Sequence, residues 1–453
     1  MKQPKYQVIA AQISQLIEAG EYPKESKLPP HRVLAKQLHT TAVTVAKAYQ
    51  LLVEQRKIAS FVGRGSFVLA ERLNNVIQAG IAPSELNFSI LQPCISLNIP
   101  VLESLLRANL YNQTSTDLFS YSENTGLQRH REAGAKWCQE YGLTVASSED
   151  IMLTNGAQNA LASIIALYSK EGDCIAVEAQ SYPGVLSICK YLRRRVVAIE
   201  MDGQGMLPQA LAAQCEIEKP SIVIVVPAQQ NPTAATMLSL RRQQLASVIE
   251  AHQLWLIEDD IYAFLNQQVL TPITDLIPNL AFYISSLSKA ISPGMRCGYV
   301  KVPHAERLKV IDYIRATIWL ASPFMFELAS DAINSGAAFN WAQLQKDKAQ
   351  QRQELVSQYL HQPVQRQMAS YSCWLQLPQY WSATGFTAAA QEKGVVVSDA
   401  SYFNAGVNDL KKSANHANTA NAVRLSVMAV TQDADFVKGL KIIEALVMTN
   451  PKQ

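Results

Sequence analysis

Five short apolar runs constrain the fold of this chain more than any other feature of its sequence. They lie at Cys174–Glu178, Val196–Ile199, Ser221–Val226, Leu254–Glu258 and Ala281–Ser285, and segments of helix length separate them. Runs this short, rich in Val and Ile, are typical of strands that are buried on both faces of a parallel sheet. We therefore expect an α/β domain built from βα units around a mostly parallel sheet.

Length and composition indicate a large globular protein with more than one domain. The chain has 453 residues, of which 48% are hydrophobic and 17% charged, and this length exceeds one ordinary core. No run of eighteen apolar residues occurs, and the opening MKQPKYQVIAAQ lacks the apolar core of a signal peptide, so we expect a cytoplasmic protein. The seven cysteines are scattered without metal-ligand spacing, so we expect reduced, buried thiols and no metal site.

Polar residues follow the predicted strands where a parallel sheet binds its ligands. Asp259–Tyr262, Pro227–Thr233 and Ser286–Lys289 each come directly after one of the runs, at the carboxyl end of a strand. Thr154–Gln158 places small residues at a predicted helix start, whose free N–H groups suit a phosphate. A phosphate seat, an Asn-Pro, an Asp, a Tyr and a Lys are the parts that hold pyridoxal phosphate. The lysine forms a Schiff base with the aldehyde, and the Asp pairs with the pyridinium nitrogen.

From about residue 86 to residue 450 the chain resembles the aspartate-aminotransferase-like proteins, the fold type I pyridoxal-phosphate enzymes. The resemblance rests on S-x-S-K at 286–289, D-x-x-Y at 259–262, N-P at 231–232 and S-Y-P-G at 181–184. It implies pyridoxal 5′-phosphate as the cofactor. It also implies a role for five residues at the cofactor ring. Lys289 would bond to the aldehyde, and Asp259 would bind the pyridine nitrogen. Tyr262 and Asn231 would hydrogen-bond the 3′-oxygen, and Tyr182 would stack on the ring.

The same resemblance implies residues at the phosphate and at a ligand carboxylate. The phosphate set is Arg296, Ser286 and the backbone of Ala157 and Gln158, with Gly156 and Ser288 beside them. Tyr121 in Y-S-E-N-T-G matches a tyrosine that reaches the phosphate from the partner subunit, so a homodimer is implied. Arg424 in V-R-L-S matches the arginine that grips a substrate carboxylate through two hydrogen bonds.

Taken singly, several of these residues also have an ordinary structural explanation. Asp259 fits a solvated acidic turn, Asn231 a simple turn and Tyr182 a core position, while Lys289 and Arg424 fit surface charges. Their common order, each at a strand end or a helix start, favours a cofactor site over coincidence.

The first seventy residues carry a different signal. They contain ten Lys or Arg against four Asp or Glu, whereas the whole chain has a net charge of only +3. A basic module on a mildly acidic body suggests an anionic partner, most simply nucleic acid, although charge alone also fits a solvated basic surface. Apolar spacing predicts helices over 6–17, 31–38 and 42–54, and then a hairpin over 58–68 with Gly63-Arg64-Gly65 at its tip.

The stretch from LPPHRVLAKQLHTTAVTVAKAYQLLVEQRKI to GRGSFV resembles the winged helix-turn-helix of GntR-type regulators. In that family the second helix of the motif enters the major groove of double-stranded operator DNA, and the wing holds phosphates. By position, the resemblance implies DNA contacts by Arg32, Thr41, Thr44, Lys47 and Arg64. Ala42 replaces the family's usual arginine, which predicts weaker or altered operator recognition. A three-helix packing module without DNA binding is the alternative.

We place the winged helix-turn-helix domain at residues 1–69, a linker at 70–86 and an aminotransferase-like effector domain at 87–453. Within the effector domain we expect a large subdomain at about 115–325 and a smaller α+β subdomain from 87–114 and 326–453. The linker is not rich in Pro or Ser, so it does not have the composition of a loose tether.

The pairing of these two domains resembles the MocR-type transcription regulators, the GabR- and PdxR-like group. It implies a pyridoxal-phosphate-dependent regulator that senses an amino compound, or the cofactor itself, through the Schiff-base lysine Lys289. Two alternatives stay open: an active aminotransferase with an appended DNA-binding module, and a sensor of the cofactor level alone. Arg424 argues against the second alternative, because a carboxylate grip needs a carboxylate.

Overall fold

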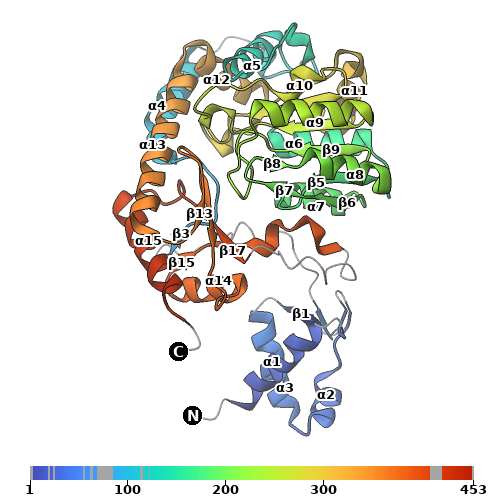
Figure 1. Ribbon diagram of the computed structural model, residues 1–453, viewed down its shortest axis with the longest axis vertical. Coiled ribbons are helices and arrows are strands. Elements are labelled where there is room, and N and C mark those ends of the chain that lie inside the picture. The colour runs from blue at the N-terminus through green and yellow to red at the C-terminus, as the bar shows by residue number, and fades with distance from the viewer. Residues whose placement is uncertain are drawn as a thin grey trace. The chain divides into compact units, whose positions relative to one another are not determined.

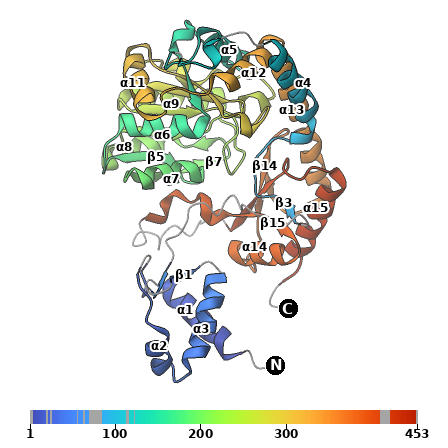
Figure 2. The same cartoon turned by 180° about the vertical axis from the view of Figure 1, so that it is seen from behind.

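The computed structural model describes residues 4–18, 21–23, 26–54, 57–61, 65–68, 85–112, 116–121, 123–408 and 421–450. It divides the chain into two compact units, Met1–Asn75 and Val76–Gln453 (Figures 1 and 2). Arg64 and most of the predicted linker lie outside the described residues.

The N-terminal unit confirms the predicted helix-turn-helix and hairpin. Its helices are α1 (Lys5–Glu18), α2 (His31–Gln37) and α3 (Ala42–Glu54), and its strands are β1 (Ile58–Phe61) and β2 (Gly65–Val68). The two strands pair antiparallel, with Ile58 opposite Val68. The described core consists of Ile9, Ala10, Ile13, Leu28, Leu34, Ala35, Val45, Ala48, Tyr49, Leu52, Ile58 and Val68.

Two side-chain hydrogen bonds fix where the two helices of this motif begin. The hydroxyl of Thr41 accepts a hydrogen bond from the backbone N–H of Thr44 at 3.2 Å, which is the arrangement of a helix N-cap. The hydroxyl of Tyr49, on α3, donates to the carbonyl oxygen of Pro29 at 2.8 Å. The prolines before α2 are thereby tied to the middle of α3.

The C-terminal unit is built on a seven-stranded sheet, which confirms the expected α/β fold. The strand order is β4-β12-β11-β10-β9-β5-β6. The bounds are β4 (Ile151–Asn155), β5 (Cys174–Glu178), β6 (Arg195–Ile199), β9 (Ile222–Val225), β10 (Trp255–Asp259), β11 (Ala281–Ser286) and β12 (Cys297–Lys301). All neighbours pair parallel except β12, which is antiparallel to both β11 and β4. The five predicted runs all form strands of this sheet.

Helices cover both faces of the large sheet. Successive residues of a strand point to opposite faces, so alternate side chains pack against different sets of helices. Ile222 and Ile224 pack with one set of helices, and Val223 and Val225 pack with the other. The first set is α6 (Ala157–Tyr168), α7 (Pro183–Tyr191) and α11 (Arg307–Thr317). The second set is α8 (Pro208–Glu218), α9 (Ser239–Ala251) and α10 (Ile273–Leu276), and α5 (Gln128–Glu140) and α12 (Pro323–Asn334) lie against β4 and β12.

A smaller sheet lies at the other end of the long helix α13 (Ala337–Tyr359) (Figure 1). Its strands are β13 (Val364–Gln365), β14 (Ser372–Gln376), β17 (Ala422–Ser426) and β16 (Ser398–Asp399), in that order. Beside it, β3 (Leu86–Asn87) pairs with β15 (Val395–Val396). The helices of this part are α4 (Ile95–Asn112), α14 (Ala383–Glu392) and α15 (Asp433–Val447), and α4 lies alongside α13.

All seven cysteines are free and buried, which confirms the expectation of buried thiols. No helix in the described ranges combines the length and the apolar character that a membrane span requires.

Candidate functional site

The predicted cofactor residues converge at the carboxyl ends of the parallel strands. Asp259 ends β10, Lys289 follows β11, and Asn231 follows β9. Gly156 follows β4 and begins α6, and Tyr182 lies between β5 and α7. Arg424 reaches the same place from β17 of the small sheet, because its guanidinium is hydrogen bonded to Asn231. The site therefore lies where the two sheets of the C-terminal unit meet.

Lys289 is the lysine that is predicted to form a Schiff base with the cofactor aldehyde. Its Nζ donates to the carbonyl oxygen of Leu91 at 2.7 Å and lies 5.9 Å from the ring centre of Tyr262. Burial, with the nearby Arg424 charge, lowers the pKa of Lys289 to about 8, although Asp259 opposes the shift. Because a lowered pKa leaves more of the amine neutral near pH 7, Lys289 is a ready nucleophile.

Asp259 offers a buried carboxylate oxygen to the same space. The residue is only 4% exposed, and its Oδ1 has no hydrogen-bond partner in the part of the chain that the structure describes. Burial first, and then the charge of Asp260, raises the pKa of Asp259 to about 7. A buried acceptor without a partner is costly, and a pyridinium N–H would supply a charge-assisted hydrogen bond. The carboxylate therefore fits the ring nitrogen of pyridoxal phosphate.

The neighbours of Asp259 are also buried, so its interpretation as part of a solvated acidic turn is wrong. Glu258 accepts from the backbone N–H and the hydroxyl of Thr274 at 2.8 and 2.7 Å, and Arg242 lies 3.4 Å away. Asp260 accepts from the hydroxyl of Tyr283 at 3.2 Å. These contacts hold the end of β10 in place around Asp259.

The turn between β4 and α6 forms a cradle that suits a phosphate. Gly156 has φ 80°, a conformation that favours glycine, and a Cβ there would lie 2.4 Å from Nη2 of Arg296. That guanidinium donates to the carbonyl oxygen of Asn155 at 3.0 Å, so it lies directly against the turn. The N–H groups of Ala157 and Gln158 begin α6, where helical N–H groups have no partner within the helix. A positive side chain and free donors thus lie together.

The two serines of the S-x-S-K motif make contacts within the protein. Ser286 Oγ donates to the carbonyl oxygen of Cys297 at 2.9 Å and accepts from the backbone N–H of Ser288 at 3.1 Å. The two serine hydroxyls are 2.9 Å apart. They therefore brace the turn that presents Lys289, and a phosphate contact by Ser286 stays a prediction.

Arg424 is a buried cation, so its interpretation as a surface charge is wrong. It is 2% exposed and lies over the ring of Phe403, with its guanidinium carbon 4.8 Å from the ring centre. Nη1 donates to Oδ1 of Asn231 at 2.8 Å, and Nη2 donates to the carbonyl oxygen of Ser89 and the hydroxyl of Ser398. Nε has no partner among the residues that the structure describes. Burial lowers the pKa of Arg424 to about 10. Among the described residues no carboxylate pairs with it, which makes it a candidate anion site.

The three predicted tyrosines differ in their surroundings. Tyr262 is buried beside Tyr371, and burial raises its pKa above the ordinary value. Tyr182 lies over Gly184, where a Cβ would come within 2.3 Å of its ring, and burial also raises its pKa. Tyr121 does not join this group within the chain: it is 86% exposed and packs only its edge against Trp319, with the ring centres 5.6 Å apart.

Several groups at the site were not predicted from the sequence. They are the carbonyl oxygens of Ser89 and Leu91, the ring of Phe403, and the hydroxyls of Ser398 and Tyr371. The Tyr371 hydroxyl donates to the carbonyl oxygen of Lys289 itself at 2.7 Å. No local pattern marks a backbone carbonyl as a partner of a side chain about two hundred residues away, so no sequence signal was available for these contacts.

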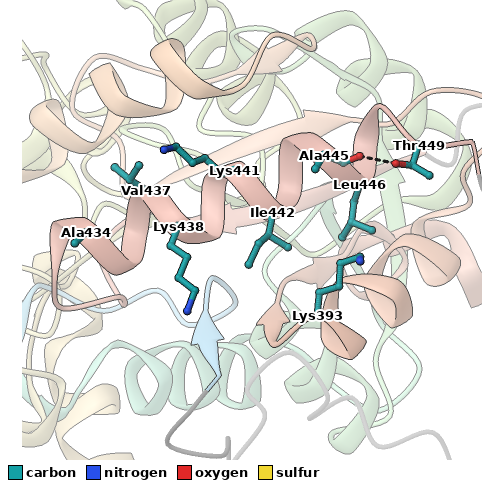
Figure 3. Close-up of a pocket in the computed structure, with 9 residues that line it drawn as sticks. All are labelled: Lys393, Ala434, Val437, Lys438, Lys441, Ile442, Ala445, Leu446 and Thr449. Atoms are coloured by element: carbon teal, nitrogen blue, oxygen red, sulfur yellow. Dashed lines mark hydrogen bonds between the residues drawn. The ribbon is translucent and has the colours of Figure 1, made fainter.

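A groove of about 600 Å³ lies elsewhere, along the outer face of α15 (Figure 3). Its lining consists of Lys393, Ala434, Val437, Lys438, Lys441, Ile442, Ala445, Leu446 and Thr449. None of the predicted cofactor residues borders it, so this groove is not the site of the cofactor.

The predicted DNA-binding residues that the structure describes lie on the outside of the N-terminal unit. Arg32, Thr41 and Lys47 are exposed, and Thr44 is half-buried. Val45, Tyr49 and Leu52 of the same helix face the core, as the apolar spacing predicts. A face of α3 therefore remains available to a partner, while Arg64 lies outside the described residues.

Comparison with known proteins identifies relatives for both units. Residues 83–443 match the family described as aminotransferase class I and II, and residues 5–68 match the bacterial regulatory proteins of the gntR family. The HTH-type transcriptional regulator YdeF of Bacillus subtilis is 28% identical over 98% of this chain and 95% of its own length. The HTH-type pyridoxine biosynthesis transcriptional regulator PdxR of Corynebacterium glutamicum is 24% identical over 65% of each chain.

Solved structures confirm the fold of the C-terminal unit. The kynurenine aminotransferase of Pyrococcus horikoshii superimposes with a TM-score of 0.73 at 20% identity, covering 81% of this chain and 91% of that chain. The α-aminoadipate aminotransferase LysN of Thermus thermophilus gives 0.70 at 21% identity, covering 83% of this chain and 96% of that chain. At this level of identity the likeness concerns the fold alone.

Proposed function

The chain belongs to the aminotransferase class I and II family and carries a gntR-type DNA-binding domain, and we propose that it is a MocR-type regulator whose operator binding responds to an amino compound. It is a pyridoxal-phosphate-dependent transcription regulator, because its C-terminal unit belongs to the aminotransferase family and a relative that aligns with 98% of the chain is an HTH-type transcriptional regulator. The proposal concerns what the regulator senses, which residues do so, and its assembly as a cytoplasmic homodimer.

The observation that carries the proposal is the state of Arg424. A guanidinium that is buried, has no carboxylate partner among the described residues and has a free Nε is an unfavourable arrangement unless an anion binds there. A sensor of the cofactor alone has no use for such a cation, because Arg296 and the start of α6 already serve the phosphate. Arg424 therefore favours an effector that carries a carboxylate as well as an amine.

The residues of the chain divide the work of the site. When bound, pyridoxal phosphate supplies an aldehyde that reacts with amines and a ring that withdraws electrons. Lys289 presents an amine whose lowered pKa of about 8 raises its neutral fraction, and Asp259 offers an acceptor to the ring nitrogen. Tyr262 and Asn231 border the ring, Tyr182 covers one side of it, and Arg296 with the turn at Gly156 holds the phosphate.

Tyr121 supports assembly as a homodimer. Its ring is 86% exposed although the loop beneath it is firmly held, because Arg131 donates to Oε2 of Glu123 at 3.0 Å and to the hydroxyl of Thr125 at 2.7 Å. A large aromatic side chain on a braced loop is suited to reach into a second copy of the chain. Two copies would also present two winged helices to two DNA half-sites.

A spectroscopic experiment distinguishes the proposed regulator from an active aminotransferase with an appended DNA-binding module. The purified full-length protein, loaded with pyridoxal phosphate, is titrated with single amino acids while its visible absorption is followed. We expect one or a few amino compounds to shift the band in a saturable way without sustained product formation. Steady turnover of ordinary amino acids at roughly 1–10³ s⁻¹ would overturn the proposal in favour of an enzyme. No response to any amine would favour a sensor of the cofactor level.

A further inference from the structure

We propose that Phe88–Leu91 is a coupling segment that reads the occupancy of Lys289 and of Arg424 through two backbone carbonyl groups, and that Asn87 is its positioning residue. The inference rests on the proposed function, since it names the route by which the same site is connected to the rest of the chain.

Two carbonyl oxygens of this segment bind two of the cations of the site, Lys289 and Arg424. The carbonyl oxygen of Leu91 accepts from Nζ of Lys289 at 2.7 Å. The carbonyl oxygen of Ser89 accepts from Nη2 of Arg424 and also lies 3.4 Å from the hydroxyl of Ser398. Hydrogen bonds from charged donors are stronger than those between neutral groups, so these two contacts can fix the position of the segment.

Asn87 gives the segment its shape. Its Oδ1 accepts from the backbone N–H of Ser89 at 2.8 Å, from the hydroxyl of Ser89 at 2.8 Å and from the backbone N–H of Ile90 at 3.3 Å. One side-chain oxygen thus closes a local turn. Since the N–H groups point toward Asn87, the carbonyl groups are left free to face the two cations.

Both ends of the segment are anchored, so a change at its middle is passed on. At one end, the ring of Phe88 stacks on the ring of Phe436 of α15, with the ring centres 5.3 Å apart. A Cβ on Gly439 of the same helix would lie within 2.4 Å of the Phe88 ring. Three residues beyond the other end, the backbone N–H of Cys94 donates to the side-chain oxygen of Gln345 of α13 at 2.8 Å. The segment therefore joins the lysine turn to helices of the small sheet. In the sequence it stands directly after the predicted linker that leads from the DNA-binding domain.

A different chemical event would weaken each of these two hydrogen bonds. When neutral Nζ adds to the aldehyde carbon of pyridoxal phosphate, a C=N bond forms and the carbonyl oxygen leaves as water with both amine hydrogens. The nitrogen then carries at most one proton, so its capacity to donate to Leu91 falls. A ligand carboxylate would draw donors of Arg424 into a bidentate pair, in competition with the carbonyl oxygen of Ser89. Leu91 would thus report the cofactor, and Ser89 would report the effector.

The first experiment uses the wild-type full-length protein and hydrogen–deuterium exchange of the peptide covering residues 86–92. The probes are pyridoxal phosphate and pyridoxamine phosphate, which share the ring and phosphate, although only the former can bond to Nζ. We expect pyridoxal phosphate to change exchange at Ser89 and Ile90 at least about threefold more than pyridoxamine phosphate does. Equal effects of the two compounds, or no effect of either, would overturn the role of Leu91.

The second experiment compares Asn87→Ala, Asn87→Asp and Ser382→Ala. Asp keeps the acceptor oxygen, and Ser382 is an exposed residue whose hydroxyl accepts from the N–H of Gly385 at 3.1 Å, a similar local bond away from the segment. The readout is the change in affinity for a DNA duplex, selected by the wild-type protein from a random pool, when pyridoxal phosphate is added. We expect a change of about fivefold or more in the wild type and both controls, and less than about twofold in Asn87→Ala, with cofactor affinity preserved.

The outcomes separate this inference from the proposed function. If wild-type DNA affinity ignores the cofactor and every amine, the proposed function fails and the inference falls with it. If the wild type responds and Asn87→Ala responds by the same factor, the coupling segment alone is disproved.

Discussion

The guanidinium of Arg424 donates to the side-chain oxygen of Asn231 across 2.8 Å. Arg424 belongs to β17 of the small sheet, whereas Asn231 follows β9 of the large sheet. The contact therefore joins the two halves of the effector domain at the point where we propose that a ligand carboxylate binds. A ligand that takes over donors of Arg424 must alter this contact, which provides a physical basis for a response to the effector.

Replacing Arg424 should remove recognition of the carboxylate and spare the cofactor. We expect Arg424→Gln to weaken binding of a responsive amino acid by roughly 10- to 150-fold, because a charged hydrogen-bonding partner is lost. The matched control is the decarboxylated amine of the same amino acid, whose binding should change much less. Both are measured by the visible absorption of the cofactor-loaded protein, and an undiminished preference for the amino acid in Arg424→Gln would refute the assignment.

Attachment of the cofactor to Lys289 should depend on pH in a way that follows its lowered pKa. Since the pKa is about 8, the neutral amine increases up to that pH and then saturates. The rate of attachment to cofactor-free protein should therefore rise about tenfold per pH unit below pH 8 and level off above it. The reference amine is N-α-acetyl-lysine, for which the rise should continue to about pH 10.4. A protein profile that matches the reference compound would contradict the burial of Lys289.

The phosphate cradle can be tested with two glycines that both have a positive φ. Gly156 has φ 80° and lies against Arg296, whereas Gly172 has φ 87° and a Cβ there would meet nothing within 4 Å. Both Gly156→Ala and Gly172→Ala should lose stability, by roughly 1–3 kcal/mol, because an L side chain rarely adopts a positive φ. Only Gly156→Ala should also weaken binding of pyridoxal phosphate, by about tenfold or more, because the guanidinium and the turn are forced apart. Equal cofactor affinities in the two variants would contradict the cradle.

The DNA-binding face can be tested at Lys47, which is exposed on α3. Lys47→Ala should weaken binding to a selected duplex and lower the slope of log affinity against log salt by about one, as expected for one phosphate contact. The cofactor absorption should be unchanged. Lys393→Ala, an exposed lysine of the effector domain, is the charge-matched control and should leave the salt slope intact. The same experiment with Arg64→Ala tests the predicted tip of the wing.

Local patterns were sufficient to predict much of this architecture. The apolar runs at 174–178 and 281–285 became strands with ends shifted by at most one residue, because buried parallel strands have a strong compositional signature. The position of β12, antiparallel between β4 and β11, was not predicted, since its own residues do not specify which strands it joins. Strand order depends on the packing of the whole chain.

The site shows the same division between local and distant information. The position of Asp259 could be predicted because its acidic side chain directly follows an apolar run, and it ends β10. The sequence around Lys289 suggests a cation without a partner, yet the structure gives it the carbonyl oxygen of Leu91, 198 residues away along the chain. A backbone acceptor leaves no mark in the sequence, so only the folded structure could reveal the coupling segment.

The most direct test of the account compares DNA affinity in the wild type and in Lys289→Ala. Fluorescence anisotropy with a duplex selected by the wild-type protein measures the dissociation constant without ligand, with pyridoxal phosphate, and with pyridoxal phosphate plus single amino acids. We expect a change of about fivefold or more in the wild type, and no response in a folded Lys289→Ala protein, because the amine that bonds to the aldehyde is gone. A wild-type dissociation constant that stays the same under all three conditions would contradict the claim that this site regulates DNA binding.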